Sequence, residues 1–218
     1  YGTYSASRFI IAGTPSGVTL APEGGAHQST ITASIGMELP GVTFIEPTYG
    51  TALSWLLADA ITRVAAGPST LKTAAPYDDG AFYFRLTTRP IDQAPFEAAR
   101  KRIGDAVLRR QVMSGGYRLF DAFEQFPDLR GSDEGERVPM VHLVASGAVM
   151  PEVLIAANEL CSEGVAAHVV DVTSADRWYG SWQRTLRQAV RTASAPSLPG
   201  PLWSVIGDRA PIVTIQDA

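Results

Sequence analysis

Residues 140–172, MVHLVASGAVMPEVLIAANELCSEGVAAHVVDV, contain two short apolar runs separated by an amphipathic stretch. The runs at 140–145 and 166–172 have the length and composition of buried strands. Between them, Pro151 and Glu152 are typical of the first turn of a helix, because that turn has unpaired N–H groups and a positive dipole end. The stretch therefore predicts strand, helix and strand, which is the repeating unit of a parallel α/β sheet.

A second group of such elements precedes it in the chain. Apolar runs at 8–12, 42–47 and 81–88 predict strands, and apolar residues at helical spacing predict a helix over residues 49–66. After the first group, the spacing predicts a helix near 181–192 and then a last strand. We therefore expect an α/β fold built from two parallel-sheet units.

Charges and turn-forming residues accumulate between the two groups. We expect residues 1–91 to form one domain, 92–138 to be a linker across the surface, and 139–218 to form a second, truncated domain. Part of the linker has the pattern of a hairpin turning at Ser114-Gly115-Gly116. Because the chain opens without Met and stops directly after a strand-like run, we expect it to be a piece of a longer protein.

The composition excludes several classes of protein. The 218 residues are 45% hydrophobic and 18% charged, with a net charge of −4, so no general attraction to nucleic acid or anionic lipid is expected. No apolar run is long enough to span a membrane. Cys161 is the single cysteine, which excludes an internal disulfide and favours a reducing, cytoplasmic location. Phosphate-loop, dinucleotide-binding, zinc-protease and serine-hydrolase motifs do not occur.

The stretch LAPEGGAHQSTITASIGM, residues 20–37, is the strongest candidate for chemistry. Gly24 and Gly25 allow the main chain to approach a ligand closely, and they precede His27. An imidazole in this position is suited to proton transfer or to holding a substrate oxygen. The alternative is a loop histidine that caps the helix expected after it.

The other polar candidates have plainer interpretations. His142 and His168 lie within strand-like apolar runs and Cys161 lies on the apolar face of a helix, so we interpret all three as packing residues. Arg89 stands at the exit of a strand, where its planar guanidinium could clamp an anionic group. A solvent-exposed surface arginine is the alternative. We assign no metal ligand in this chain.

Four segments in a fixed order resemble the thiamin-diphosphate enzymes of the transketolase type. They are RFIIAGTPSGVTLAPEGGAHQS (8–29), IEPTYGTALSWLL (45–57), FYFRLTTRPID (82–92) and HLVASGAVMPEVLIAANEL (142–160). The resemblance is strongest to the homodimeric, decarboxylating first component of pyruvate and related 2-oxoacid dehydrogenases. It implies that the first domain is the later part of a pyrimidine-binding domain, and the second a truncated C-terminal domain.

The resemblance also implies roles for the residues around His27. The family carries a G-x-T-H-Q loop that is similar to Gly24-Gly25-Ala26-His27-Gln28, and its histidine lies beside the reacting carbon of the cofactor. By this match His27 would assist proton transfer or hold a developing oxyanion, while Gly24 and Gly25 would lie against thiamin diphosphate. The cofactor's activating glutamate and its Mg²⁺ site would belong upstream of Tyr1.

Three residues bear on the choice of substrate. Glu23 stands where sugar-transferring members carry an aspartate that reads a substrate hydroxyl, and Gln28 follows the family histidine. Arg89, in contrast, coincides with an arginine that binds phosphate in sugar-transferring members. The resemblance therefore implies that Glu23, Gln28 and Arg89 contact a substrate, which we expect to be pyruvate or another short 2-oxoacid.

The implied partners follow from this assignment. We expect a homodimer and a dihydrolipoyl acyltransferase that receives the acyl group, with neither a nucleic acid nor a membrane as partner. One alternative is a ketol transferase of the transketolase type. The other is a non-catalytic α/β dimerisation module, because a site built between domains is incomplete in one piece of the protein.

Overall fold

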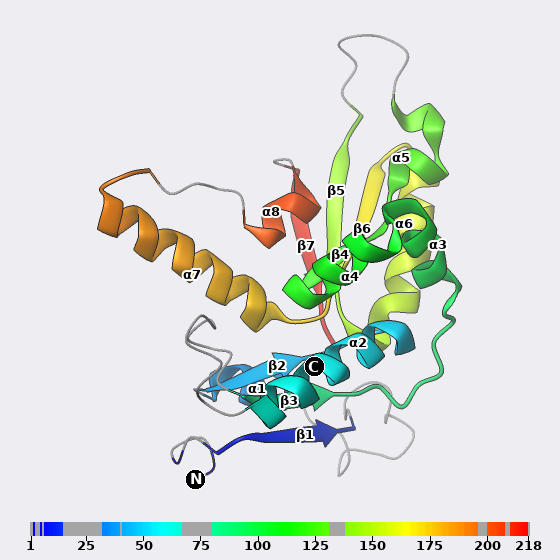
Figure 1. Cartoon of the computed structure of the whole chain (residues 1–218). Coiled ribbons are helices and arrows are strands. Elements are labelled where there is room, and N and C mark those ends of the chain that lie inside the picture. The colour runs from blue at the N-terminus through cyan, green and yellow to red at the C-terminus, as the bar shows by residue number, and fades with distance from the viewer. Residues whose placement is uncertain are drawn as a thin grey trace.

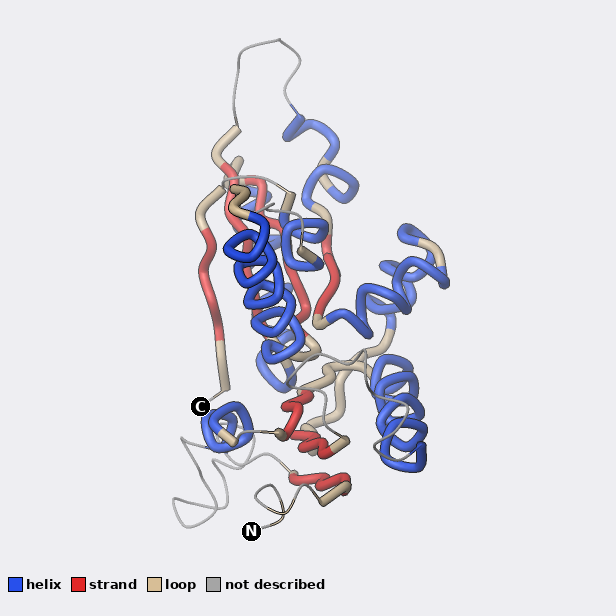
Figure 2. The backbone as a smooth tube through the Cα atoms, turned by 60° about the vertical axis from the view of Figure 1, so that its left-hand side comes forward, coloured by secondary structure: helices blue, strands red, loops and turns tan. Residues whose placement is uncertain are grey.

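A computed structural model of the chain describes residues 2, 5, 7–14, 32–39, 41–66, 80–130, 138–195, 200–207 and 210–217. Within these residues the strands form two separate sheets, with helices packed around both (Figure 1). Strand and helix segments alternate along most of the chain (Figure 2). The predicted α/β class is confirmed.

The first sheet has the strand order β1-β3-β2 among the described residues, and both pairings are parallel. Each strand lies where an apolar run predicted one, and α2 confirms the helix expected over residues 49–66. The bounds are β1 (Phe9–Gly13), α1 (Thr32–Glu38), β2 (Val42–Ile45), α2 (Gly50–Ala66) and β3 (Ala81–Arg85).

The second sheet has the order β4-β6-β5-β7 in the described part of the chain. The pairs β5–β6 and β5–β7 are parallel, as predicted, whereas β4 runs antiparallel to β6. Helices α6 and α8 pack against its strands, whereas α7 packs against β2 of the first sheet. The bounds are β4 (Gly116–Phe120), β5 (Met140–Ala145), η4 (Gly147–Val149), α6 (Met150–Ser162), β6 (Ala166–Val172), α7 (Ala175–Thr192), α8 (Pro201–Ile206) and β7 (Ile212–Ile215).

The segment 92–138, which we expected to be a linker, carries regular structure that belongs to the second sheet. The hairpin expected around residues 114–116 is wrong, because its first arm is helical and only its second arm, β4, is a strand. The helix forms because Leu108 and Val112, four residues apart, are both buried on one face. The remaining elements are α3 (Ala94–Ile103), α4 (Asp105–Ser114), α5 (Ala122–Gln125) and η3 (Pro127–Arg130). The domain borders stay a prediction.

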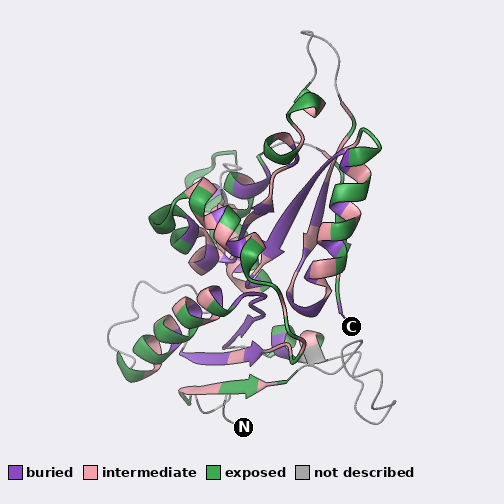
Figure 3. Ribbon diagram, turned by 90° about the vertical axis from the view of Figure 1, so that its right-hand side faces the viewer, coloured by how far each residue is buried: buried purple, intermediate pink, exposed green. Residues whose placement is uncertain are grey.

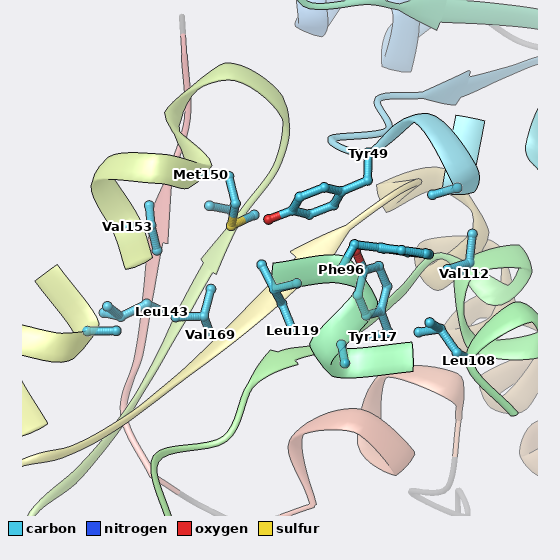
Figure 4. Close-up of a cluster of buried hydrophobic side chains, with 14 of the residues drawn as sticks. Tyr49, Phe96, Leu108, Val112, Tyr117, Leu119, Leu143, Met150, Val153 and Val169 are labelled. Carbon is cyan, nitrogen blue, oxygen red and sulfur yellow. The ribbon is translucent and has the colours of Figure 1, made fainter. Parts of the chain in front are cut away.

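Buried aromatic and aliphatic side chains join the two units. We call Tyr49, Phe96, Leu108, Val112 and Tyr117 the apolar cluster; all five are buried (Figure 4). The ring of Phe96 packs edge-on against Tyr117, with centroids 5.7 Å apart, and lies 5.5 Å from the ring of Tyr49. Burying a side chain of this size contributes roughly 1.5–3 kcal/mol. Strand β6, inside the second sheet, is buried along most of its length (Figure 3).

The outer edge of β2 is bonded to the second unit. The backbone N–H of Phe44 donates to Asp176 Oδ2 at 2.7 Å, and its carbonyl accepts a 2.7 Å hydrogen bond from Ser174 Oγ. The N–H of Glu46 donates to the carbonyl of Thr173 at 2.9 Å. The segment between β6 and α7 therefore occupies the side of β2 that faces away from β3.

Among the described helices, none has the length and apolarity needed to cross a bilayer.

Candidate functional site

The carboxyl ends of strands from both sheets converge on one place. Arg85 is the last residue of β3, Glu46 follows β2, and Ser146 follows β5. Thr173 follows β6, and Asp217 lies two residues beyond β7, which brings this end of the chain beside the first sheet (Figures 1 and 3). Ligands of α/β proteins gather at the carboxyl ends of parallel strands. This convergence, which we call the sheet junction, is therefore the candidate site.

A buried ion pair lies at the centre of the sheet junction. The side chain of Arg85 is 2% exposed, and its guanidinium bonds to Glu46 Oε1 and donates to the carbonyl of Asp217 at 2.9 Å. Asp217 Oδ2 is 3.6 Å from the same guanidinium, and Ser146 Oγ donates to Glu46 Oε2 at 2.9 Å. Burial raises the pKa of Glu46, although Arg85 and Ser146 oppose this. Both oxygens of Glu46 therefore act as acceptors that join the sheets.

A second buried carboxylate accepts from both units. Asp171, inside β6, accepts from Thr48 Oγ1 at 2.7 Å and from the hydroxyl of Tyr117 at 2.6 Å. Thr48 in turn accepts a 2.9 Å hydrogen bond from the N–H of Gly147. Burial raises the pKa of Asp171 to about 7, although the two hydroxyl donors oppose the shift. This chain of hydrogen bonds fixes the position of the β5 end against the β2 end.

Gly147 permits this close approach. Its φ of +64° is one that side-chain-bearing residues rarely adopt. A Cβ at this position would also lie 2.8 Å from Glu46 Oε1. The glycine is therefore needed both for the turn after β5 and for the contact with the ion pair.

The sheet junction borders a cavity of about 200 Å³. The carboxylates of Glu46 and Asp217 line it, together with mainly apolar side chains that include Met37, Phe44 and Trp178. Cavities that enclose a drug-sized ligand measure about 300–1,000 Å³, so this one has room for a small group only. An apolar space with carboxylates at one side suits a short, partly apolar molecule that carries hydrogen-bond donors.

The residues predicted around the family-like loop lie outside the described residues. These are Glu23, Gly24, Gly25, His27 and Gln28. Their roles therefore stay predictions.

The strand that precedes this loop, β1, ends beside the carboxyl end of β3. Gly13, at the end of β1, pairs with Arg85 at the end of β3, and its carbonyl accepts a 2.8 Å hydrogen bond from the N–H of Leu86. The chain thus leaves β1 beside the carboxyl end of β3, from which the loop to Arg89 also begins.

Arg89 binds the second unit. Its guanidinium makes a bidentate contact with Glu152 at 2.9 and 2.7 Å and donates to the carbonyl of Ala148 at 3.2 Å. The hydrogen bonds from Arg89 lower the pKa of Glu152. Glu152 lies in the first turn of α6, as predicted, and the two side chains are 38% and 56% exposed. Arg89 thus holds the loop after β3 against α6, and its contact with a substrate stays a prediction.

The packing interpretation of His142, His168 and Cys161 is confirmed. All three are buried, and the imidazole rings lie stacked with centroids 5.4 Å apart on neighbouring strands. Nδ1 of His168 accepts a 3.2 Å hydrogen bond from the N–H of Ala122. Among the described residues, no group of three or more His, Cys, Asp or Glu side chains could hold a metal ion.

Sequence reasoning missed Arg85, Glu46 and Asp171. A usable signal was present, because Arg85 and Asp171 are charged residues inside apolar strand runs. A charge in a buried strand must be paired or hydrogen-bonded, so each of these residues implied a partner. The identity of that partner depends on how the two sheets meet.

Comparison with known proteins gives one curated relative of moderate similarity. No protein-family profile matches the chain. The 6-deoxy-6-sulfo-D-fructose transketolase subunit SqwH of Clostridium sp. (strain MSTE9) is 27% identical over 191 residues, which cover 88% of this chain and 46% of that protein. The chain therefore spans about half the length of this relative.

Solved structures agree on the fold. Transketolase from Leishmania mexicana matches 99% of this chain with a TM-score of 0.57 and 16% identity. A transketolase from Pichia stipitis matches 98% with a TM-score of 0.60 and 15% identity. In both cases the match covers 24% of the larger protein. The two sheets and their helices thus have the fold of a segment of transketolase.

Proposed function

We propose that the chain is part of a transketolase-like enzyme that uses thiamin diphosphate. The observation that carries this proposal is the 27% identity to a transketolase subunit, which extends over 88% of the chain. The transketolase-like fold of both sheets supports it. In this proposal residues 1–91 are the later part of the pyrimidine-binding domain and residues 139–218 a truncated C-terminal domain.

We propose ketol transfer as the reaction, with a ketose that carries a terminal anionic group as the first substrate class to test. The relative is named for a sulfonated fructose. The family resemblance also implies that Arg89 matches a phosphate-binding arginine of sugar-transferring members. The second candidate is decarboxylation of a short 2-oxoacid, which Glu23 favours because it replaces the aspartate of sugar-transferring members. A dihydrolipoyl acyltransferase is a partner only in that second case.

The residues around His27 carry the proposed chemistry. Thiamin diphosphate supplies an electron sink for the acyl carbanion when it is bound. His27 is then the group that moves a proton or holds the substrate oxygen, and Gly24 and Gly25 give the main chain room beside the cofactor. The described residues contain no Mg²⁺ ligand cluster. We propose that the enzyme is a cytoplasmic homodimer and that, as the family resemblance implies, other parts of the protein supply the Mg²⁺ ligands.

The test is a pair of assays on the intact protein with thiamin diphosphate and Mg²⁺. One assay follows ketol transfer from a phosphorylated or sulfonated ketose to an aldehyde, and the other follows 2-oxoacid decarboxylation with an artificial electron acceptor. We expect turnover in the first, lost in His27→Ala. Turnover of 2-oxoacids alone would support the second candidate, and activity in neither assay would overturn both.

Substrate contact by Arg89 has its own test. Arg89→Gln should raise KM for the anionic ketose more than it lowers kcat, because it removes a binding charge rather than a group that reacts. Arg110→Gln is the matched control, since it removes one exposed arginine from α4. An equal rise in KM in both variants would contradict the assignment of Arg89.

The 218-residue chain by itself tests the third interpretation, a non-catalytic module. Calorimetric titration with thiamin diphosphate and Mg²⁺ should give no measurable binding, because the proposed site is shared with other parts of the enzyme. Tight binding would show that the domain borders are misplaced.

A further inference from the structure

A second cavity, of about 190 Å³, lies on the opposite side of β2 from the first. Thr43 lines it, whereas the next residue, Phe44, lines the cavity at the sheet junction, because successive strand residues point to opposite faces. The other walls come from α2, the end of α4, the first three turns of α7 and the start of α8. We call it the arginine pocket.

Arginines from both units line this pocket: Arg63 of α2 and Arg177 and Arg184 of α7. One carboxylate oxygen, Asp59 Oδ2, accepts from both Arg63 Nε and Arg177 Nη2, each at 2.9 Å. Arg177 Nη1 donates to the carbonyl of Met113 at 2.7 Å. The guanidinium of Arg177 is thereby fixed in orientation between α2 and α4.

Donors in the pocket remain available to a ligand. The side chain of Arg177 is only 10% exposed, and its Nε is buried without a hydrogen-bond partner among the described residues. A buried donor without a partner costs free energy, which only an acceptor that reaches its buried position would recover. Arg184 forms no ion pair with any described residue, and the hydroxyl of Ser181, one helical turn before it, also lines the pocket.

The charges in the pocket favour an anion. Three arginines face two carboxylates: Asp59, which the two arginines already share, and Asp176, which accepts from the N–H of Phe44. The guanidinium of Arg184 thus has no opposite charge to offset it within the described residues. An arginine fork and hydroxyl donors match the oxygen geometry of phosphate.

We propose that the arginine pocket binds a phosphate-type oxyanion, either inorganic phosphate or the phosphate group of a small phosphomonoester. Its volume is several times the roughly 30 Å³ that a water molecule takes in the liquid, so the anion and a small substituent fit. Because the walls come from both units, the bound anion would tie α7 to α2 and β2. The pocket is separate from Arg89, which lies against α6.

The experiment is a titration of the intact protein with inorganic phosphate, at ionic strength held constant with sodium chloride. Calorimetry and the melting temperature are followed without thiamin diphosphate or substrate, so the outcome is independent of the proposed reaction. We expect a saturable heat and a saturable rise in Tm that chloride does not produce. Glycerol 3-phosphate in a second titration distinguishes the free ion from a phosphomonoester.

Three variants locate the site. Arg184→Gln should weaken phosphate binding roughly tenfold, since it removes a charged hydrogen-bond donor. Arg191→Gln, which removes an arginine from the same helix outside the pocket, should bind as the unchanged protein does. Arg89→Gln should also retain binding. Circular dichroism of each variant checks that the fold is intact.

Other outcomes overturn the proposal. An absence of saturable binding would do so directly. Equal weakening in Arg184→Gln and Arg191→Gln would show a diffuse charge effect along α7, and loss in Arg89→Gln alone would place the anion at the proposed substrate site.

Discussion

The sheet junction and the apolar cluster both join the two units, but by opposite physical means. The cluster excludes water from large side chains such as Phe96 and Leu108, whereas the junction buries Arg85, Glu46 and Asp171 and satisfies each with specific partners. The free energy gained by burying apolar surface does not depend on the orientation of the groups. The free energy of a buried ion pair does depend on it. The cluster therefore supplies stability, whereas the junction determines how the sheets meet.

The largest expected effect comes from removing the central cation of the junction. Arg85→Met leaves Glu46 buried without its charge partner, which should lower the free energy of unfolding by about 3–5 kcal/mol in urea titrations. The double variant Arg85→Met with Glu46→Gln should lose less, because Glu46 then carries no charge and Asp217 alone is left without the cation. A loss below about 1 kcal/mol in the single variant would mean that the pair is not buried in solution.

Asp171 should make stability depend on pH. Its pKa is about 7 in the folded chain and 3.8 as a reference value, so the folded state binds the proton more tightly. This stability is fully present below about pH 4 and is lost as the pH rises through about 7, on the order of 4 kcal/mol in total. Glu46 and Asp176, whose pKa values burial also raises, act in the same direction.

Urea titrations between pH 4 and 8 measure this slope. Asp171→Asn should flatten it, while Asp128→Asn removes an exposed carboxylate and serves as the matched control. An unchanged slope in Asp171→Asn would assign the pH dependence to other groups.

The apolar cluster should respond to a loss of volume instead. Leu108→Ala removes a fully buried side chain and should cost about 3 kcal/mol at any pH between 5 and 8. Val107→Ala, one residue away on the exposed side of α4, is the control and should cost less than 1 kcal/mol. A marked pH dependence of the Leu108 effect would remove the distinction between the two regions.

A glycine pair separates backbone strain from contact with the ion pair. Gly147→Ala should destabilise by about 2 kcal/mol, because it combines a positive φ with a Cβ 2.8 Å from Glu46 Oε1. Gly164→Ala shares the positive φ but meets nothing within 4 Å, so it should cost about 1 kcal/mol. Equal losses in thermal melts would show that the junction relaxes around the added methyl group.

The smallest effect belongs to the exposed contact between Arg89 and Glu152. Glu152→Gln should change the free energy of unfolding by less than about 1 kcal/mol, and the change should shrink in high salt. A salt-independent loss above 2 kcal/mol would show that this pair acts like the buried one.

Local patterns were sufficient for most of the fold. Residues 50–66 and 166–172 were predicted correctly because each carries a clear apolar period of its own. Within residues 92–138 the hairpin was predicted wrongly, because two buried positions of α4 lie among arginines and because β4 takes its place only through pairing with β6. Whether β4 forms a strand depends on its partner β6, about 50 residues later in the sequence. A prediction from neighbouring residues does not include that partner.

The site was less accessible to sequence reasoning. The partners of Arg85 and Asp171 lie 39 and 123 residues away along the chain, in Glu46 and Thr48. The arginine pocket likewise depends on α2 and α7 coming together. A single residue type, such as the histidine at position 27, can be recognised beside its neighbours in sequence, but a site assembled from distant strand ends cannot.

The hydrogen bonds along the outer side of β2 have a consequence for solubility. A sheet edge with free N–H and C=O groups is a template on which another chain can add as a strand. Here Asp176, Ser174 and Thr173 occupy those groups at Phe44 and Glu46. The second unit therefore covers this edge of the sheet. A preparation of residues 1–91 alone would expose the backbone groups of β2 and would be prone to aggregation.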